Sequence, residues 1–311
     1  MNNFLKRLFK FALLFISLVT AIVVVNTYII RKLRLVAQTK KNILVVGDSN
    51  TQCAINDVKW KNACNLSISA ETYFYSYLKL RHTLKTSPQV DTVVLSFAPH
   101  NLFDNGWLFN TSNIYTKFKV YYPMMEREDF NYLYDHNPKA VLKGMPDILS
   151  ISINNIIKTG IKRSLKSSYG DYMPLTRDLL KKVQEKLKKN EPLPFFKIPN
   201  SFKISDSELK YLHKIMELCK THRVKLYLLN TPKRFEILEY PRYGVSTFNA
   251  YYDANFSDID YIDCSRLELP ENYYSDFVHL NKSGSEYFSM MIQQEGLSKM
   301  FQKYGRNKQS N

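Results

Sequence analysis

The chain has 311 residues, of which 45% are hydrophobic, and it carries 44 lysine and arginine residues against 28 acidic ones, a formal net charge of +16. This length suits one α/β domain with a sizeable core and an additional element or two. The basic excess fits anionic lipid, anionic glycan or nucleic acid as a partner. No RNA- or DNA-binding motif accompanies it, which argues against nucleic acid. The cysteines at 53, 64, 219 and 264 form neither a CxxC pair nor a Cys/His cluster, which argues against a structural zinc site.

The N-terminus predicts a membrane anchor. After a basic tail at residues 1–10, Phe11 to Ile30 form an uncharged run of 20 residues, long enough as a helix to cross a bilayer. No small-x-small exit for a signal peptidase follows, so an uncleaved anchor is favoured over a signal peptide. Basic residues lie on both sides of the run and do not fix its orientation. Residues 31–41 read as a linker.

From Asn42 onward the pattern predicts a doubly wound α/β domain over 42–296, with a C-terminal tail at 297–311. Short apolar runs, typical of buried parallel strands, alternate with amphipathic helical segments. The predicted strands are Asn42–Val46, Ala63–Ile68, Thr92–Ala98, Val224–Asn230 and Asp260–Cys264. The predicted helices are Glu71–Lys85, Ser205–Arg223 and Asn281–Glu295.

The strand pattern disappears between about residues 102 and 200. This stretch is too long for a simple crossover, so it predicts an inserted, mostly helical element. Its clearest helix is Thr176–Asn190, whose lysines form either a solvated face or a surface for anionic lipid or glycan. Cys53 and Cys64, which flank the loop after the first strand, are either two buried thiols or a disulfide formed outside the cytoplasm.

The stretch Asn42 to Thr51, NILVVGDSNT, carries the first candidate site residue. Polar residues that follow a buried parallel strand lie at the ligand-binding edge of the sheet. Gly47 allows a sharp turn, Asp48 supports the turn, and Ser49 is presented at the edge as a candidate nucleophile. The alternative is an ordinary strand-to-helix turn in which Ser49 caps the helix.

A second candidate group lies just before the last predicted helix, in Asp276-Phe277-Val278-His279. An acid three residues before a histidine can orient the imidazole and stabilise the imidazolium ion. A D-x-x-H motif by itself is also common at structural histidines. Together with Ser49 it supplies a hydroxyl, a base and an orienting acid, the set needed for acyl transfer.

The segments VVGDSNT, NLSISAET, SFAPHN and DFVHLNKSG resemble, in this order, the sequence blocks of SGNH/GDSL hydrolases. The resemblance covers about residues 42–101 and 204–295. It implies a flavodoxin-like three-layer α/β fold, with Ser49 as nucleophile, His279 as base and Asp276 as the residue that orients His279. Thr51 stands where the G-x-S-x-G motif of α/β-hydrolases requires glycine, which argues against that family.

Two positions depart from the family pattern, and both concern the oxyanion hole. The resemblance implies donors from the Ser49 backbone, from a glycine that is here Ala70, and from an asparagine in a G-x-N-D block. This chain reads Ala98-Pro99-His100-Asn101, so either His100 or Asn101 takes the asparagine role.

The resemblance implies a membrane-anchored, extracytoplasmic serine esterase or O-acyltransferase that needs no cofactor or metal. By analogy with membrane-tethered members, its substrate would be an acylated carbohydrate of the cell envelope or an exported glycan, with acetyl as the acyl group, or another ester. Its partners would be the bilayer, through residues 11–30, and membrane proteins of envelope biosynthesis. The alternative is a binding or scaffold protein of envelope polysaccharide biosynthesis that keeps the fold but has weak or no activity.

Overall fold

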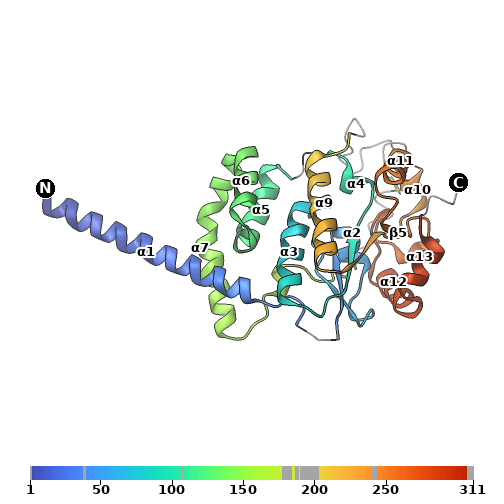
Figure 1. Ribbon diagram of the computed structural model, residues 1–311, viewed down its shortest axis with the longest axis horizontal. Helices are drawn as coiled ribbons and strands as arrows, with labels where there is room; N and C mark the ends of the chain where they lie inside the picture. Colours follow the sequence, from blue (N-terminus) through green and yellow to red (C-terminus); the bar gives the residue numbers. More distant parts are fainter. Residues whose placement is uncertain are drawn as a thin grey trace. The chain divides into compact units, whose positions relative to one another are not determined.

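The structure is a computed structural model that describes residues 2–37, 40–104, 106, 108–176, 184–185, 189, 203–239 and 244–306. Its chain divides into two compact units (Figure 1). The helical unit comprises Met1–Leu35 and Leu108–Ser168, and the α/β unit comprises Val36–Trp107 and Tyr169–Asn311. Each unit has its own internal packing contacts.

The α/β unit is organised around a five-stranded parallel sheet. Its strands are β1 (Ile43–Val46), β2 (Ala63–Asn65), β3 (Thr92–Ser96), β4 (Lys225–Asn230) and β5 (Asp260–Asp263). They lie in the order β2-β1-β3-β4-β5, with Val45 opposite both Asn65 and Val94. This is the strand order of a flavodoxin-like doubly wound sheet. The predicted α/β class and all five predicted strands are confirmed.

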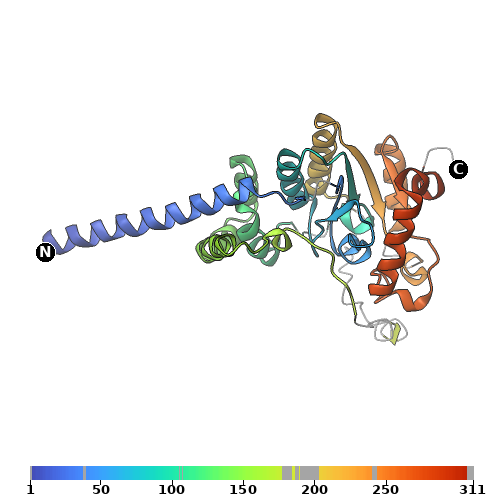
Figure 2. The same cartoon turned by 90° about the horizontal axis from the view of Figure 1, so that it is seen from below.

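Helices cover both faces of the sheet, which gives three layers (Figures 1 and 2). Side chains alternate across each strand, so the two faces take different residues. On one face Val45, Val94 and Leu229 form a buried cluster with Phe288 and Ile292. The helices of this layer are α2 (Ser49–Ala54), α12 (Lys282–Glu295) and α13 (Leu297–Tyr304). The opposite layer pairs α3 (Tyr73–Thr86) with α9 (Asp206–Thr221), and α9 contacts β4.

Shorter elements complete the α/β unit. They are α4 (Pro99–Leu102), α10 (Phe235–Leu238), α11 (Val245–Asn255) and the 3-10 turn η4 (Glu271–Tyr273). The C-terminal stretch differs from the predicted tail at 297–311. It begins with α13, because Met300 is fully buried in the core cluster and holds the chain against β5.

The helical unit contains α1 (Asn2–Lys32), α5 (Thr111–Tyr121), η1 (Tyr122–Met124), α6 (Arg127–His136), α7 (Pro138–Gly160) and η2 (Lys166–Ser168). Helix α1 is long and apolar enough to cross a membrane. Side chains of this unit join α1 to the other helices: the Asn26 amide donates to the Tyr122 hydroxyl at 2.6 Å, which lies 2.7 Å from the Ser152 hydroxyl.

The predicted helical insertion is present, but the helical unit includes only Leu108–Ser168 of the predicted range 102–200. Residues from Tyr169 return to the α/β unit, where Gly170 packs against the Leu66 backbone and the Met173 N–H donates to the Gln52 carbonyl at 3.1 Å. The predicted helix Thr176–Asn190 lies mainly outside the described residues. Cys53 and Cys64 are buried thiols and do not form a disulfide.

Candidate active site

Ser49 is presented at the sheet edge by a turn that needs glycine. Gly47 has φ of +148°, and a Cβ atom there would lie 2.2 Å from Cβ of Ser96 on the neighbouring strand. Asp48 is the N-cap of α2, and its side chain accepts a hydrogen bond from the Asn50 N–H at 2.9 Å. Ser49 is therefore the first residue of α2 and not its cap, so its hydroxyl is available for other contacts.

The structure brings Ser49, His279 and Asp276 into one hydrogen-bonded chain. Nε2 of His279 lies 2.8 Å from Oγ of Ser49, although 230 positions separate the two residues in sequence. On the other side of the ring, Nδ1 of His279 lies 2.8 Å from Oδ2 of Asp276. This arrangement can pass the serine proton to the imidazole while the carboxylate stabilises the resulting charge.

Asp276 is held as an orienting carboxylate. Its Oδ1 atom accepts hydrogen bonds from the backbone N–H groups of Val278 (2.8 Å) and His279 (2.9 Å). Burial opposes its ionisation, but the hydrogen bond and charge of His279, together with these two N–H groups, outweigh burial and lower the pKa of Asp276. Asp276 is therefore ionised at neutral pH and can accept a hydrogen bond from an N–H group at Nδ1 of His279, which directs Nε2 toward Ser49.

Asp48 is the centre of a second polar network. Its carboxylate accepts hydrogen bonds from the Ser96 hydroxyl (3.1 Å) and the Asn101 amide (3.0 Å), and it forms an ion pair with His100. Burial opposes ionisation of this carboxyl, yet the charge and hydrogen bond of His100 and the hydrogen bonds from Asn50 and Asn101 hold the pKa of Asp48 far below its ordinary value. Asp48 thus links the ends of β1 and β3 as a permanent anion.

His100 and Asn101 both lie beside Asp48, but their side chains differ in freedom. Oδ1 of Asn101 accepts the Ala98 N–H at 2.9 Å, and its amide nitrogen uses one of its two N–H groups to donate to Asp48. His100 keeps 35% of its side chain exposed, and its Nε2 also lies 2.9 Å from the Asn50 amide nitrogen. His100 is therefore the more exposed of the two side chains at this edge of the sheet.

Ala70 has φ of +56°, the left-handed conformation that favours glycine. The loop that carries it is fixed by its neighbour Glu71, whose buried carboxylate pairs with Lys79 at 2.8 Å and accepts the Ser76 hydroxyl at 2.9 Å. These contacts join the residue after Ala70 to α3, because Lys79 and Ser76 both belong to that helix.

Replacing Ala70 by glycine is expected to stabilise the protein by about 1 kcal/mol, because glycine adopts a positive φ without the Cβ penalty. Chemical denaturation of A70G beside the wild type measures this difference. The matched control is Ala250→Gly, at an exposed position in the interior of α11, which is expected to destabilise by about 1 kcal/mol. A destabilised A70G would contradict the strain assigned to this position.

Lys233 is a site residue that the sequence analysis missed. It is 3% exposed, and its ammonium group donates to Asn50 Oδ1 (2.9 Å), Thr231 Oγ1 (2.7 Å) and the Val278 carbonyl (3.4 Å). It therefore ties the helix that carries Ser49 to the loop that carries His279. Its position after β4, in Thr231-Pro232-Lys233, was the available signal, but one lysine among 44 basic residues does not stand out.

Substitution of Lys233 by methionine is expected to lower turnover by about 100-fold, because Asn50 and the Val278 carbonyl lose their common donor and the two catalytic segments shift. Steady-state kinetics on an activated ester measures the effect. Lys225→Met is the matched control, since Lys225 is an exposed lysine on β4, the strand that precedes Lys233, and pairs with Asp260. Unchanged turnover in K233M would show that Lys233 does not position the site.

The K233M variant also tests how the unfolding free energy depends on pH. Burial lowers the pKa of Lys233 to about 8, against the opposing charges of Asp48 and Asp276. Between about pH 8 and the ordinary lysine pKa, the unfolded chain binds more protons than the folded protein, so this residue makes stability rise with pH. The unfolding free energy of the wild type relative to K233M should therefore increase over this range. A constant difference would contradict the shifted pKa.

Comparisons with known proteins give limited similarity. One protein-family model matches residues 185–301, which is less than half of the chain. No curated protein matches the sequence significantly. In the part of the chain that the structure describes, no group of three or more His, Cys, Asp or Glu residues could hold a metal ion.

Solved structures whose backbone is similar to that of this chain include three bacterial proteins. One is a protein proposed to be an acylhydrolase from Bacteroides fragilis (13% identity, TM-score 0.38, 84% of this chain and 88% of that chain covered). Another is a GDSL-like lipase from Bacteroides thetaiotaomicron (12%, 0.36, 84% and 90%). A third is a protein proposed to be a platelet activating factor from Streptococcus pneumonia (12%, 0.37, 92% and 97%). At these TM-scores the similarity carries no functional argument, so function rests on the site.

Proposed function

We propose that this protein is a membrane-anchored serine esterase or O-acyltransferase of the SGNH/GDSL type. The observation that carries the proposal is the chain from Ser49 Oγ through the His279 ring to Asp276, with 2.8 Å at each link. The sequence blocks that resemble this family supply the same three residues in the same order. Further support comes from the position of Ser49, which follows β1 at the carboxyl end of a parallel strand, where ligands bind in such folds.

In the proposed reaction, Oγ of Ser49 attacks the carbonyl carbon of an ester while its proton moves to Nε2 of His279. The tetrahedral intermediate collapses, the ester C–O bond breaks, and the leaving alcohol takes the proton from His279. Water or a sugar hydroxyl then attacks the acyl-serine while its proton moves to His279. The bond between the acyl carbon and Oγ of Ser49 breaks, the acyl group leaves as an acid or a new ester, and Oγ takes the proton back from His279. Hydrolysis and transfer differ only in this last acceptor.

The oxyanion would be stabilised by donors near the sheet edge. The backbone N–H of Ser49 belongs to the first turn of α2. The Ala70 backbone is held in the conformation that a glycine would adopt. Of the two side-chain candidates we favour His100, because 35% of its side chain is exposed, whereas Asn101 is 9% exposed.

The proposed substrate is an acylated carbohydrate, with an O-acetyl group as the transferred acyl, on the cell envelope or an exported glycan. Support comes from the membrane-length helix α1, which fits a single-pass anchor, and from the net charge of +16, which suits an acidic polymer or an anionic lipid surface. By analogy with membrane-tethered relatives of the proposed family, the α/β unit would lie outside the cytoplasm and work beside membrane proteins of envelope biosynthesis.

Labelling with a fluorophosphonate probe tests the proposed chemistry. The detergent-solubilised wild type is expected to be labelled covalently at Ser49, whereas Ser49→Ala and His279→Ala are not. Intact-mass and peptide mass spectrometry locate the adduct. A folded wild type that stays unlabelled beside a reactive serine esterase would favour the alternative, a binding or scaffold protein of polysaccharide biosynthesis. The alanine at position 70 is the observation in favour of that alternative.

A further inference from the structure

Helix α1 is packed into the helical unit over only part of its length. Large apolar side chains from Phe4 to Leu18 are exposed, for example Leu14 at 70%. Further along, Asn26 and Ile30 are fully buried, Asn26 donates to the Tyr122 hydroxyl, and the Arg31 side chain donates to the Pro123 carbonyl at 3.1 Å. The C-terminal half of α1 is therefore a structural part of this unit.

If α1 crosses a bilayer, its charged residues determine which part of the helix lies in the hydrocarbon layer. A hydrocarbon layer needs about 20 apolar residues. Lys6, Arg7 and Lys10 exclude the first ten residues from that layer, so it must extend from Phe11 to about Ile30. Asn26, which bonds Tyr122 of η1, lies inside this range, as do Phe15, Val19 and Val23, which line a groove together with residues of α7. Arg31, which bonds Pro123, lies just beyond it. The helices packed against it must then also enter the membrane.

Helix α7 has the surface that such a position requires. Leu142, Met145, Ile153 and Ile157, followed by Ile161 just after the helix, are exposed large apolar residues with spacings that place them along one side. We call these five residues the apolar stripe. Lys139, Lys143 and Lys158 belong to the same helix. An exposed apolar stripe on a helix that also carries lysines is typical of a helix that lies in a membrane interface.

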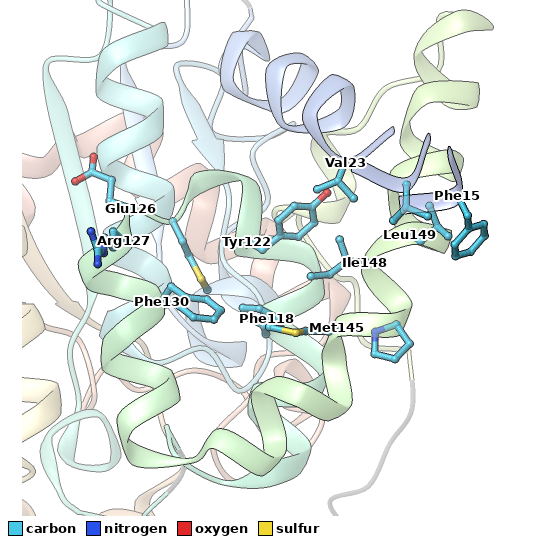
Figure 3. Close-up of a pocket in the computed structure, with 13 residues that line it drawn as sticks. Phe15, Val23, Phe118, Tyr122, Glu126, Arg127, Phe130, Met145, Ile148 and Leu149 are labelled. Carbon is cyan, nitrogen blue, oxygen red and sulfur yellow. The ribbon is translucent and has the colours of Figure 1, made fainter. Parts of the chain in front are cut away.

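A groove of about 770 Å³ lies between α1 and α7, and Met145 of the apolar stripe forms part of its wall (Figure 3). Phe15, Val19 and Val23 of α1 line one wall, and Phe118 and Phe130 also line it. Glu126 and Arg127 are the charged residues among its lining, and Figure 3 shows them at the end away from Phe15 and Leu149. The groove thus combines a long apolar part with one charged end.

We propose that this groove binds an acyl chain of a membrane phospholipid, with its headgroup at the Glu126 and Arg127 end and the apolar stripe of α7 seated in the membrane. The inference rests on the membrane anchorage included in the proposed function, and not on the chemistry of Ser49. A phospholipid fits because the bilayer supplies acyl chains at the depth of Val19, and because arginine and glutamate complement the phosphate and ammonium of a zwitterionic headgroup. The volume is within the range of small-molecule sites.

Photolabelling of the full chain in phosphatidylcholine vesicles tests this site. The vesicles contain a small fraction of phosphatidylcholine with a diazirine on one acyl chain, and peptide mass spectrometry maps the adducts. Adducts are expected on Met145 and Leu149, and on Phe118 and Phe130 within the groove. Met145→Gln, which places an amide in the groove, is expected to lower labelling of Phe118 and Phe130 about tenfold. Met290→Gln, at an exposed methionine of α12 in the α/β unit, is the matched control.

The possible outcomes separate the proposals. Adducts confined to α1 would overturn the site and leave a simple tether. Adducts on the apolar stripe but not on Phe118 or Phe130, or a protein crosslink in the groove, would show that another group fills it and would also overturn the site. Absence of adducts on α1 itself would mean that the anchor in the proposed function is wrong. The Ser49→Ala variant should label like the wild type, because the probe does not depend on the catalytic serine.

Discussion

Replacing Ser49 by alanine is expected to lower the rate of ester hydrolysis or acyl transfer by about 10⁴- to 10⁶-fold. The substitution removes the hydroxyl oxygen that forms the acyl-enzyme bond in the proposed reaction. It should leave the fold intact, because Asp48 and not Ser49 caps α2, and alanine is well tolerated in the first turn of a helix. The rate on a p-nitrophenyl ester, compared at equal folded concentration, measures the effect.

Ser69→Ala is the matched control for this measurement. Ser69 lies in the loop after β2, and its hydroxyl donates to the Gln52 side chain at 2.7 Å instead of contacting the histidine. Its removal should change the rate by less than about tenfold. If the Ser49→Ala variant kept more than about a hundredth of the wild-type rate, the reaction would not proceed through an acyl-serine, and a histidine-activated water would be the better mechanism.

The sheet was predictable because its strands are short, apolar runs bounded by turn residues. The run Ile43–Val46 is buried on both faces of the sheet, which is why it reads as an uninterrupted hydrophobic segment. Predicted strand ends differ from the observed ones by up to three residues, as at Leu66 to Ile68, where the chain leaves β2 but keeps hydrogen bonds to β1. Such ends depend on tertiary contacts that local sequence does not determine.

The helical unit was predicted only in outline. Sequence indicated helices between residues 102 and 200, but not that η1 and α7 would contact α1. That association depends on contacts such as Asn26 to Tyr122, which join residues 96 positions apart. An asparagine within an apolar run stands out in the sequence, because polar residues are rare in membrane-spanning helices. The sequence does not identify Tyr122 as its hydrogen-bond partner.

The candidate site shows the same division. Ser49 and the Asp276 to His279 motif could be found because each follows a local rule, a strand-to-helix turn in one case and a three-residue spacing in the other. Asp48 was identified as a supporting residue, but its ion pair with His100 and its bond to Asn101 required the register of β1 and β3. Lys233 was missed because its three acceptors come from three separate segments.

Replacement of Asp276 by asparagine is expected to lower the rate at neutral pH by about 10⁴-fold while the loop keeps its shape. The asparagine Oδ1 can still accept the Val278 and His279 N–H groups, which Asp276 Oδ1 now accepts at 2.8 and 2.9 Å. Its NH₂ group would then face Nδ1 of His279. To accept a hydrogen bond from this NH₂ group, the imidazole must have a lone pair at Nδ1 and its proton on Nε2. Nε2 could then no longer accept the proton of Ser49.

The pH dependence separates this tautomer effect from unfolding. In the wild type the pKa of Asp276 is lowered, so the carboxylate contributes stability above its unfolded-state pKa and loses that contribution as pH falls through the folded-state pKa. The asparagine variant should lack this loss in acid, and its thermal unfolding near neutral pH should remain cooperative. Asp263→Asn at the end of β5, where Oδ1 accepts the Ser265 N–H at 3.1 Å, is the matched control and should keep the wild-type rate. A similar loss of rate in both variants would mean that Asp276 acts through general electrostatics and not by orienting His279.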